Sequence, residues 1–324
     1  MTLTQYKQQL VDLMIDFKKL DSNKADNDPK ELKKFFDIVY NSGVLNITDL
    51  EKSIQDQYKL ELFTFLSSIS GTLSFLTIQI LAAYNIMAKH NYHKKDHYLN
   101  KKCGIAINHL RAPITVIDSI KVEGGYKLNG TLTWASGYKI FDTLLIGFHN
   151  DGNELEAMTS FESQSGFEIG DVDETFVGYA LNTVDIKLDN FFVKEEDIVS
   201  SNSIGNYTKV KSASKTIHFC LYGLALNAIL QSDNKQFKSK ASYDLEMLKD
   251  KTIYSTDIHE LDLLRVELFR LAQDIVTTAM SLIGGKSVFS CGDLQRSYRE
   301  LIMFNSNGLN DTLKDIIKTK FINR

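Results

Sequence analysis

The 324-residue chain contains very little proline and cysteine. It has two prolines, Pro29 and Pro113, and no low-complexity tract or repeat, so we expect its parts to pack into one compact subunit. Its three cysteines, Cys103, Cys220 and Cys291, lie far apart and form no CxxC pattern. This odd number argues against a disulfide framework and indicates a reduced compartment, so we expect a cytoplasmic location.

An excess of basic residues is also missing. The formal net charge is -4 and the sequence pI is about 6.0. Lysines and arginines are scattered among acidic residues and form no stripe, which argues against a nucleic-acid partner. The length and the 43% hydrophobic content are sufficient for a large core, so the composition indicates a globular protein.

The amino-terminal segment lacks the apolar core and the small-residue cleavage site of a signal peptide. Its apolar residues recur at helical spacing from Tyr6 to Leu20, which predicts an amphipathic helix.

Residues 62–88 carry no charge and are long enough to cross a membrane. Polar side chains are spread through this stretch and Ser70-Gly71 interrupts its centre, so we expect two buried helices and no membrane span.

Helical and strand-like patterns occupy successive parts of the chain. Helical periodicity dominates up to residue 103, short alternating segments such as residues 183–189 follow, and helical periodicity returns after residue 203. We therefore predict an α+β protein with an N-terminal helical domain, a middle antiparallel β-barrel-like domain and a C-terminal helical bundle. The predicted boundaries are 1–103, 104–202 and 203–324.

One tryptophan, Trp134, stands in the run Gly124 to Phe148, where a hairpin signal leads into strand-like residues. Alternation along a strand puts Trp134 and Ser136 on one face and Ala135 on the other. A large flat ring beside a hydroxyl suits a planar heteroaromatic ligand. On spacing alone, a core tryptophan beside a hydrogen-bonded serine is the more common arrangement.

The order of helices, β domain and helices resembles the acyl-CoA dehydrogenase superfamily, and four segments carry the resemblance. They match the family's charged turn before its first β strand, its strand pair ending in Trp and a hydroxyl residue, its last β strand, and its paired glycines followed by an arginine-bearing helix. These segments are residues 94–107, 124–137, 180–200 and 283–301.

The resemblance implies a flavin, FAD or FMN, as cofactor. It implies that Trp134 lies beside the isoalloxazine ring and that the Ser136 hydroxyl reaches N5, with Ala135 between them. Ile107 and Asn108 match the family's strand whose backbone contacts the pyrimidine edge of the flavin. It further implies an acyl thioester or similar small substrate, and a homodimer or homotetramer built through the C-terminal helices.

Two departures from the family pattern concern the phosphate and adenosine half of FAD. The turn at residues 108–113 has no glycine, and Ser281 stands where the family has a glutamine ahead of Gly284 and Gly285. FMN has no adenosine half, so these departures affect FMN binding less than FAD binding.

A third departure concerns the catalytic base. Asn307 precedes Gly308 where most of the family has a glutamate, and asparagine cannot accept the substrate's α proton. Desaturation would need another carboxylate, and the candidates are Glu267, Glu260, Glu300 and Asp311.

Two alternatives need no such carboxylate. One is a two-component flavin monooxygenase, in which His109 would assist near the first β turn; a structural surface histidine is the more common role for such a residue. The other is a catalytically silent binding protein that has lost its flavin.

Two further sets of residues, three histidines and two arginines, are better explained by structural roles than by metal or phosphate binding. His90, His93 and His97 have the spacing of metal ligands on one helical face, but they stand among lysines and asparagines at a turn, so we predict no metal site. Arg296 and Arg299 are spaced to grip a phosphate, but ion pairs with Asp293 or Glu300 are favoured.

Overall fold

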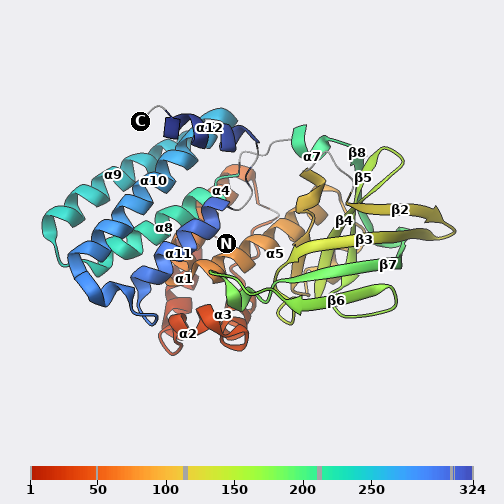
Figure 1. Ribbon diagram of the computed structural model, residues 1–324, viewed down its shortest axis with the longest axis horizontal. Helices are drawn as coiled ribbons and strands as arrows, with labels where there is room; N and C mark the ends of the chain where they lie inside the picture. The colour runs from red at the N-terminus through yellow and green to blue at the C-terminus, as the bar shows by residue number, and fades with distance from the viewer. Residues whose placement is uncertain are drawn as a thin grey trace. The chain divides into compact units, whose positions relative to one another are not determined.

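Helices and strands are segregated along the chain in the computed structural model, which describes residues 2–48, 50–111, 116–209, 214–306, 309 and 311–322 (Figure 1). Contacts divide the chain into two compact units. The helical unit contains Met1–Phe75, Phe176–Ala180 and Ser212–Arg324, and the sheet unit contains Leu76–Thr175 and Leu181–Lys211. The helical unit is therefore assembled from both ends of the sequence.

The helices at the start of the chain begin at strong capping residues. The Thr2 hydroxyl accepts the Gln5 N–H and the Gln5 side chain accepts the Thr2 N–H, and Asp28 caps a helix that has proline in its first turn. The amphipathic first helix buries four apolar side chains, Tyr6, Leu10, Leu13 and Phe17, as its periodicity predicts. These helices are α1 (Leu3–Phe17), α2 (Ser22–Asn27), α3 (Pro29–Asn41) and α4 (Lys52–Ile69).

The uncharged stretch forms two helices, because the chain breaks at Ser70 between α4 and α5 (Gly71–Lys89). In the described part of the chain, α5 alone is long and apolar enough to cross a membrane. In its most apolar window, 67% of the residues are buried inside the protein. This is the burial expected of a core helix, and it agrees with the sequence-based prediction.

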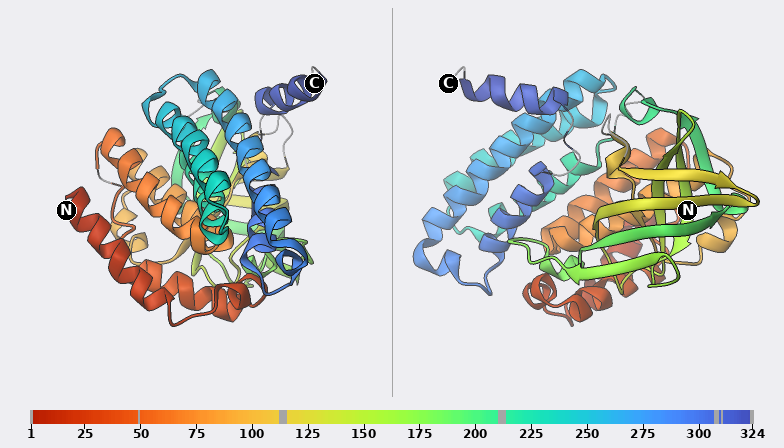
Figure 2. Two further views of the ribbon diagram at one scale, coloured as in Figure 1. Left: turned by 90° about the vertical axis from the view of Figure 1, so that its left-hand side faces the viewer. Right: turned by 45° about the vertical axis from the view of Figure 1, so that its right-hand side comes forward.

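Helices α4, α9, α10 and α11 pack around α8, and α12 contacts α10 (Figures 1 and 2). A Cβ atom on Gly223 of α8 would lie 2.1 Å from Ser67 Oγ and 2.5 Å from the Thr64 carbonyl oxygen of α4. Glycine therefore allows α8 and α4 to approach closely. The elements are α8 (Thr216–Gln231), α9 (Lys235–Tyr254), α10 (Ile258–Ile283), η4 (Gly284–Val288), α11 (Asp293–Ser306) and α12 (Asp311–Ile322).

The sheet unit contains two four-stranded sheets, of order β1-β4-β5-β8 and β2-β3-β7-β6. All strand pairs are antiparallel except β1 with β4, which is parallel. The strands are β1 (Cys103–Ala106), β2 (Ile117–Val122), β3 (Gly125–Ala135), β4 (Thr143–Asn150), β5 (Asn153–Ser160), β6 (Phe167–Val172), β7 (Val184–Lys194) and β8 (Ile198–Ser203). The short elements are α6 (Lys95–Tyr98), η1 (Asn108–Arg111), η2 (Tyr179–Leu181), η3 (Glu195–Asp197) and α7 (Asn206–Lys209).

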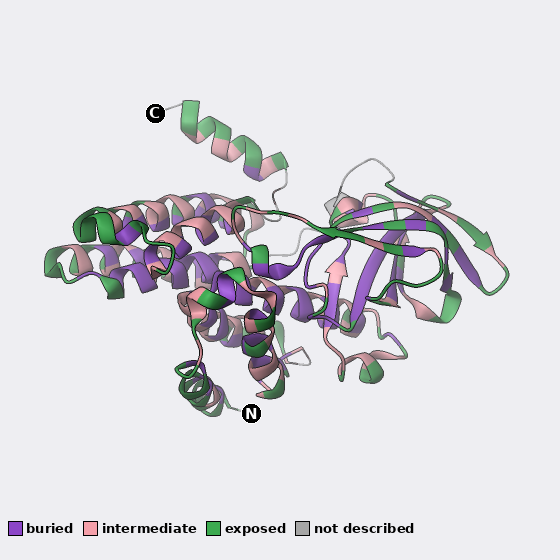
Figure 3. Cartoon of the chain, turned by 60° about the horizontal axis from the view of Figure 1, so that its bottom comes forward, coloured by how far each residue is buried: buried purple, intermediate pink, exposed green. Residues whose placement is uncertain are grey.

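The two sheets share an apolar core. Strands β2 and β4 contact each other across the sheets, as do β1 and β3, and the Tyr126 and Phe148 rings pack with centroids 5.4 Å apart. Burial alternates along much of β7 and follows one side of the amphipathic helices (Figure 3). The prediction of an α+β chain with helices, a barrel-like β part and helices is confirmed, with one parallel strand pair within it.

Candidate functional site

Trp134 lies at a β-bulge near the end of β3. Leu132 pairs with Ile186 and Ala135 pairs with Val184, so β3 has one extra residue opposite Asp185. Trp134 has the left-handed φ of 60°, which is uncommon for a bulky residue, and its N–H donates to Asp185 Oδ1 at 3.2 Å. The bulge turns the ring outward: the side chain is 65% exposed.

This exposure overturns the interpretation of Trp134 as a core residue. A large exposed ring held on strained backbone forms no part of the apolar core of the sheet unit, so its burial cannot explain its presence. Ala135 is fully buried and Ser136 is buried too, so simple alternation does not hold through residues 134–136, because the bulge interrupts it.

Ser136 is buried, and its Oγ lies 2.8 Å from Thr183 Oγ1, with either hydroxyl able to donate. The backbone on both sides is held by hydrogen bonds. The Gly137 N–H donates to the Leu181 carbonyl at 2.6 Å, and the Asn182 side-chain amide donates to the Tyr138 carbonyl at 2.8 Å. The end of β3 is thus tied to the residues that lead into β7.

The Phe141 ring lies against both β1 and the residues that follow β3. Cβ atoms on Gly104 and Gly137 would lie 2.6 Å and 2.2 Å from the Phe141 ring, so both glycines leave room for it. Ile107, just beyond β1, is buried, while Asn108 at the start of η1 is exposed. The triplet of residues 134–136 and the end of β1 therefore belong to one part of the sheet unit.

His109 is half-buried on η1, and its Nε2 lies 2.9 Å from the Gly147 carbonyl oxygen. A carbonyl accepts hydrogen bonds, so Nε2 carries the proton and Nδ1 is left with its lone pair. Burial lowers the pKa of His109 below its usual value, and the nearby His149 adds to this effect. The ring is therefore neutral near pH 7.

The candidate bases in the helical unit are engaged by other groups. Glu267 is exposed on α10 and accepts a hydrogen bond from Lys320 Nζ at 2.9 Å. Glu260 accepts one from Ser255 Oγ at 2.6 Å. Asp311 pairs with Lys314 at 3.3 Å, and Glu300 is fully buried. Asn307 and Gly308 lie outside the described residues, as do residues 112–115 of the predicted phosphate turn.

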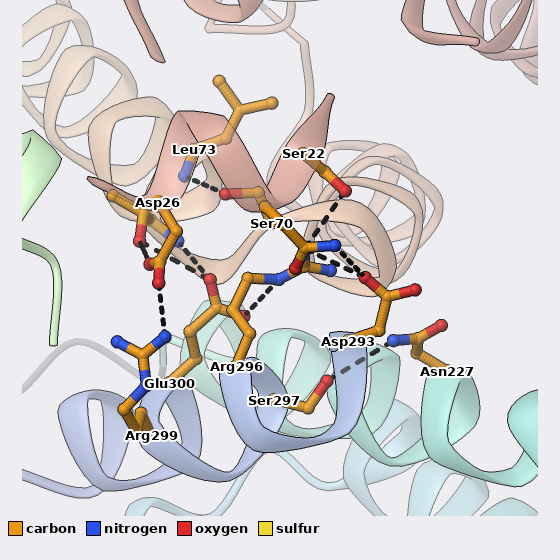
Figure 4. Close-up of polar contacts among 12 residues, drawn as sticks. Ser22, Asp26, Ser70, Leu73, Asn227, Asp293, Arg296, Ser297, Arg299 and Glu300 are labelled. Atoms are coloured by element: carbon orange, nitrogen blue, oxygen red, sulfur yellow. Dashed lines mark hydrogen bonds and ion pairs between the residues drawn. The ribbon is translucent and has the colours of Figure 1, made fainter. Parts of the chain in front are cut away.

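Glu300 belongs to a buried polar network between α2, α11 and the start of α5 (Figure 4). It accepts the Thr72 N–H at 3.2 Å, and its second oxygen lies 3.8 Å from Arg296 Nε. Arg299 Nη2 contacts Asp26 Oδ2 at 2.5 Å. Burial raises the pKa of Glu300 to about 7, although Arg296 opposes that shift.

The two arginines therefore act as structural ion-pair partners. Arg296 also contacts Asp293 at 3.1 Å and has a side-chain exposure of 2%. The predicted partners Asp293 and Glu300 are those of Arg296, whereas Arg299 pairs with Asp26, which was not predicted, and both guanidinium groups contact groups of the helical unit.

The three histidines of the predicted metal-ligand spacing do not lie on one helix. Helix α5 ends at Lys89, so His90, His93 and His97 do not share one helical face. Among the residues with described positions, no group of three or more His, Cys, Asp or Glu side chains is placed to hold a metal ion.

Thr183 and Asp185 were not singled out from the sequence, although each contacts the triplet of residues 134–136. Both lie in the alternating segment of residues 183–189, which predicts a strand. Which residues this strand opposes depends on pairing register and on the bulge in β3, and neither can be read from local sequence.

Solved structures resemble this fold over nearly the whole chain. Butyryl-CoA dehydrogenase from Megasphaera elsdenii superposes with a TM-score of 0.77 at 14% identity, covering 99% of each chain. The chain has the acyl-CoA dehydrogenase fold. The HsaA monooxygenase from Mycobacterium tuberculosis shares it with a TM-score of 0.70 at 11% identity, covering 98% of this chain and 99% of the other.

KijD3, solved in complex with FMN and a dTDP-linked amino-keto sugar, is similar with a TM-score of 0.76 at 14% identity. The superposition covers 99% of this chain and 95% of that one. No protein-family model matches the sequence, and no curated protein matches it. A dehydrogenase, a monooxygenase and KijD3 thus share the acyl-CoA dehydrogenase fold with this chain, at identities that establish architecture alone.

Proposed function

We propose that this chain is a flavin-dependent oxidoreductase of acyl-CoA dehydrogenase type that binds its flavin at Trp134 and Ser136. The exposed ring of Trp134, two residues before Ser136 in the sequence, and the buried Ser136–Thr183 hydroxyl pair carry the proposal. The pair has two protons but one mutual hydrogen bond, so one proton is available to an acceptor atom of a ligand. A flat heteroaromatic ring with an edge acceptor fits this donor set.

A bound flavin would supply hydride or electron transfer. The protein's part is to hold it. Trp134 would cover the ring system and exclude water from it, and Ser136 would donate a hydrogen bond at N5. The backbone at Ile107 and Asn108 would contact the pyrimidine edge. FMN is the favoured flavin because the turn at residues 108–113 lacks glycine, and FAD is the alternative.

The fluorescence of Trp134 tests this proposal directly, because the chain has no other tryptophan. Adding oxidised or reduced FMN or FAD should quench the tryptophan emission with a saturating dependence on flavin. Trp134→Phe removes the emission and serves as the control, with flavin binding then followed by flavin absorbance. If neither flavin in either redox state binds the full-length protein, the proposal fails and a binding protein without flavin is favoured.

Two reactions are compatible with the proposed flavin site. Desaturation of an acyl thioester needs a carboxylate base. Since Glu267, Glu260 and Asp311 are bonded to other side chains and Glu300 is buried, the described carboxylates favour the second reaction, oxygenation of a small substrate by reduced flavin. His109 is then the candidate proton acceptor, because its neutral ring keeps a lone pair on Nδ1.

Anaerobic mixing separates the two reactions. Bleaching of oxidised flavin by acyl-CoA thioesters would support desaturation with Glu267 as the first base to test. Oxygen-dependent product formation with a flavin reductase would support oxygenation. His109→Gln keeps a donor to the Gly147 carbonyl, so a loss of product with unchanged flavin binding would assign the proton transfer to His109.

We also infer assembly into a homodimer or homotetramer and a cytoplasmic location. The apolar stripe of α10 and the three free cysteines support these inferences. Size-exclusion chromatography with light scattering tests the first of them.

A further inference from the structure

Helix α9 carries apolar side chains on two opposite sides. Its inner side, where Ala241 and Leu245 are buried, packs within the helical unit, in which α9 contacts α8 and α10. On the opposite side, Tyr243, Met247 and Tyr254 are 64%, 46% and 82% exposed. Packing within one copy of the chain therefore accounts for the inner side and leaves an outer apolar stripe in contact with solvent.

The outer stripe has the spacing of a coiled-coil seam. Together with the exposed Lys240 and Asp250, its residues stand at positions 240, 243, 247, 250 and 254, at intervals of three and four residues in turn. This spacing keeps all five side chains along one line of the helix, where a second helix can pack. Contact with water alone requires no such order.

We propose that the outer stripe of α9 is a self-association surface, on which α9 of a second copy packs antiparallel about a two-fold axis at the level of Leu245. The inference rests on the self-assembly inferred with the proposed function, to which it assigns a surface, and it is independent of the flavin. An isologous contact of this kind requires a surface that is complementary to itself.

The outer stripe meets this requirement. In the antiparallel pair, positions equally distant from Leu245 face each other across the axis, so Lys240 faces Asp250 of the second copy and Tyr243 faces Met247 of the second copy. The two-fold axis repeats each contact, which gives two pairs of opposite charge and two contacts between a methionine sulfur and an aromatic ring. A register shifted by one heptad loses both of these charge pairs, so the charges favour the register about Leu245.

Two acidic side chains, Asp244 and Glu246, flank the axis, and each would lie near its own copy across it. Each has a lysine of the same helix as partner: Lys240 Nζ lies 2.6 Å from Asp244 Oδ1, and Lys249 pairs with Glu246. An ammonium group has three donors, so Lys240 can keep Asp244 while it reaches Asp250 of the second copy. The acidic groups at the axis are thus compensated within each helix.

A single helix pair is a small interface. The 20-residue α9 is about 30 Å long, and a pair of such helices lies at the low end of stable protein contacts. We therefore expect self-association that depends on protein concentration and weakens with salt, which screens the pairs of Lys240 with Asp250.

Sedimentation velocity over a wide range of protein concentration tests this surface. Met247→Glu places a carboxylate opposite each Tyr243 ring and should weaken self-association through α9 about tenfold or more. Asp250→Lys converts both charge pairs into repulsive ones and should have a similar effect. The double reversal, Lys240→Asp with Asp250→Lys, restores two attractive pairs and should return the affinity to within about threefold of the wild type.

Met14→Glu is the matched control, because Met14 is 41% exposed on α1 and lies outside the stripe. It should leave self-association unchanged. Circular dichroism checks that each variant folds, and if Met247→Glu does not fold, Asp250→Lys takes its place.

A wild type that stays monomeric at every concentration overturns this surface and the inferred assembly together. A wild-type assembly whose size and affinity are unchanged by Met247→Glu and Asp250→Lys overturns the α9 surface alone. Failure of the double reversal to restore an affinity lost in Asp250→Lys overturns the antiparallel register. Flavin binding, followed by Trp134 quenching, should be the same in all variants, so none of these outcomes bears on the flavin site.

Discussion

Glu300 accepts the backbone N–H of Thr72 at 3.2 Å, although 228 positions separate them in the sequence. Thr72 lies in the first turn of α5, where backbone N–H groups have no partner within the helix. A carboxylate on α11 therefore caps α5 from a distant part of the chain. Since the Glu300 carboxyl group is fully buried, its ionisation should change the free energy of unfolding of the protein.

We expect the free energy of unfolding to fall as the pH rises from 5 to 8, because Glu300 ionises in this range. Burial raises its pKa from 4.5 to about 7, so its favourable contribution is fully present below pH 4.5 and is lost as the pH rises through 7. The difference corresponds to about 3 kcal/mol at most. Glu300→Gln keeps an oxygen for the Thr72 N–H and removes the charge, so its unfolding free energy should depend less on pH.

Urea unfolding of the wild type and of Glu300→Gln at several pH values measures this difference. Glu156→Gln is a positive comparison, because Glu156 is also a buried glutamate with a raised pKa, in the sheet unit, and its replacement should reduce the pH dependence in the same direction. Identical pH slopes for the wild type and Glu300→Gln would show that Glu300 keeps its ordinary pKa.

Gly223→Ala should destabilise the protein by about 1–3 kcal/mol, because the new Cβ would overlap Ser67 Oγ and the Thr64 carbonyl oxygen. Gly285→Ala is the matched control, as its Cβ would meet nothing within 4 Å, and it should change stability by less than about 0.5 kcal/mol. Chemical denaturation measures both. An unchanged midpoint for Gly223→Ala would mean that α8 and α4 can separate at little cost.

Trp134→Asn should leave stability unchanged or raise it by about 1 kcal/mol, since asparagine tolerates the left-handed backbone better than tryptophan does. The same change should abolish flavin binding, followed by flavin absorbance. Trp134→Phe keeps an aromatic ring and should retain part of the affinity. A loss of about 3 kcal/mol or more in Trp134→Asn would instead identify Trp134 as a packing residue.

Asp185→Ala should weaken flavin binding roughly fivefold, equivalent to about 1 kcal/mol, because the Trp134 N–H loses its acceptor at the bulge. Asp189→Ala, on the same strand and also exposed, should leave the affinity unchanged. Equal effects of the two substitutions would mean that charge, and not the bulge, governs binding.

Much of the fold could be predicted because local patterns carry it. The helical stripe and the break at Ser70 act within a few residues; the stripe is predicted from Tyr6 to Leu20 and α1 ends at Phe17, and the break appears at its predicted place. The order of helices, sheets and helices follows from the same periodicities and from the family resemblance.

The details of the candidate site depend on long-range pairing, and could not be predicted in the same way. The exposure of Trp134 results from a bulge, and alternation alone allowed a core position. Thr183 and Asp185 become neighbours of residues 134–136 through the register of β3 with β7. The pairing of Arg296 with Asp293 and Glu300 follows helical spacing, but the contacts of Glu300 with Thr72 and of Arg296 with residues 22–23 depend on how α11 packs against α2 and α5, which no local spacing encodes.

The division of the helical unit between the two ends of the sequence has a consequence for synthesis on the ribosome. Most of the sheet unit, from Leu76 to Thr175, is made before Glu300 exists, so the Thr72 N–H lacks its Glu300 acceptor until α11 has emerged, and the first turn of α5 has the local Ser70 cap on the Leu73 N–H. Helix α4 meanwhile exposes the apolar side that α8 later covers. Nascent chains should therefore depend on chaperones until late in translation, with the sheet unit acquiring protease resistance first.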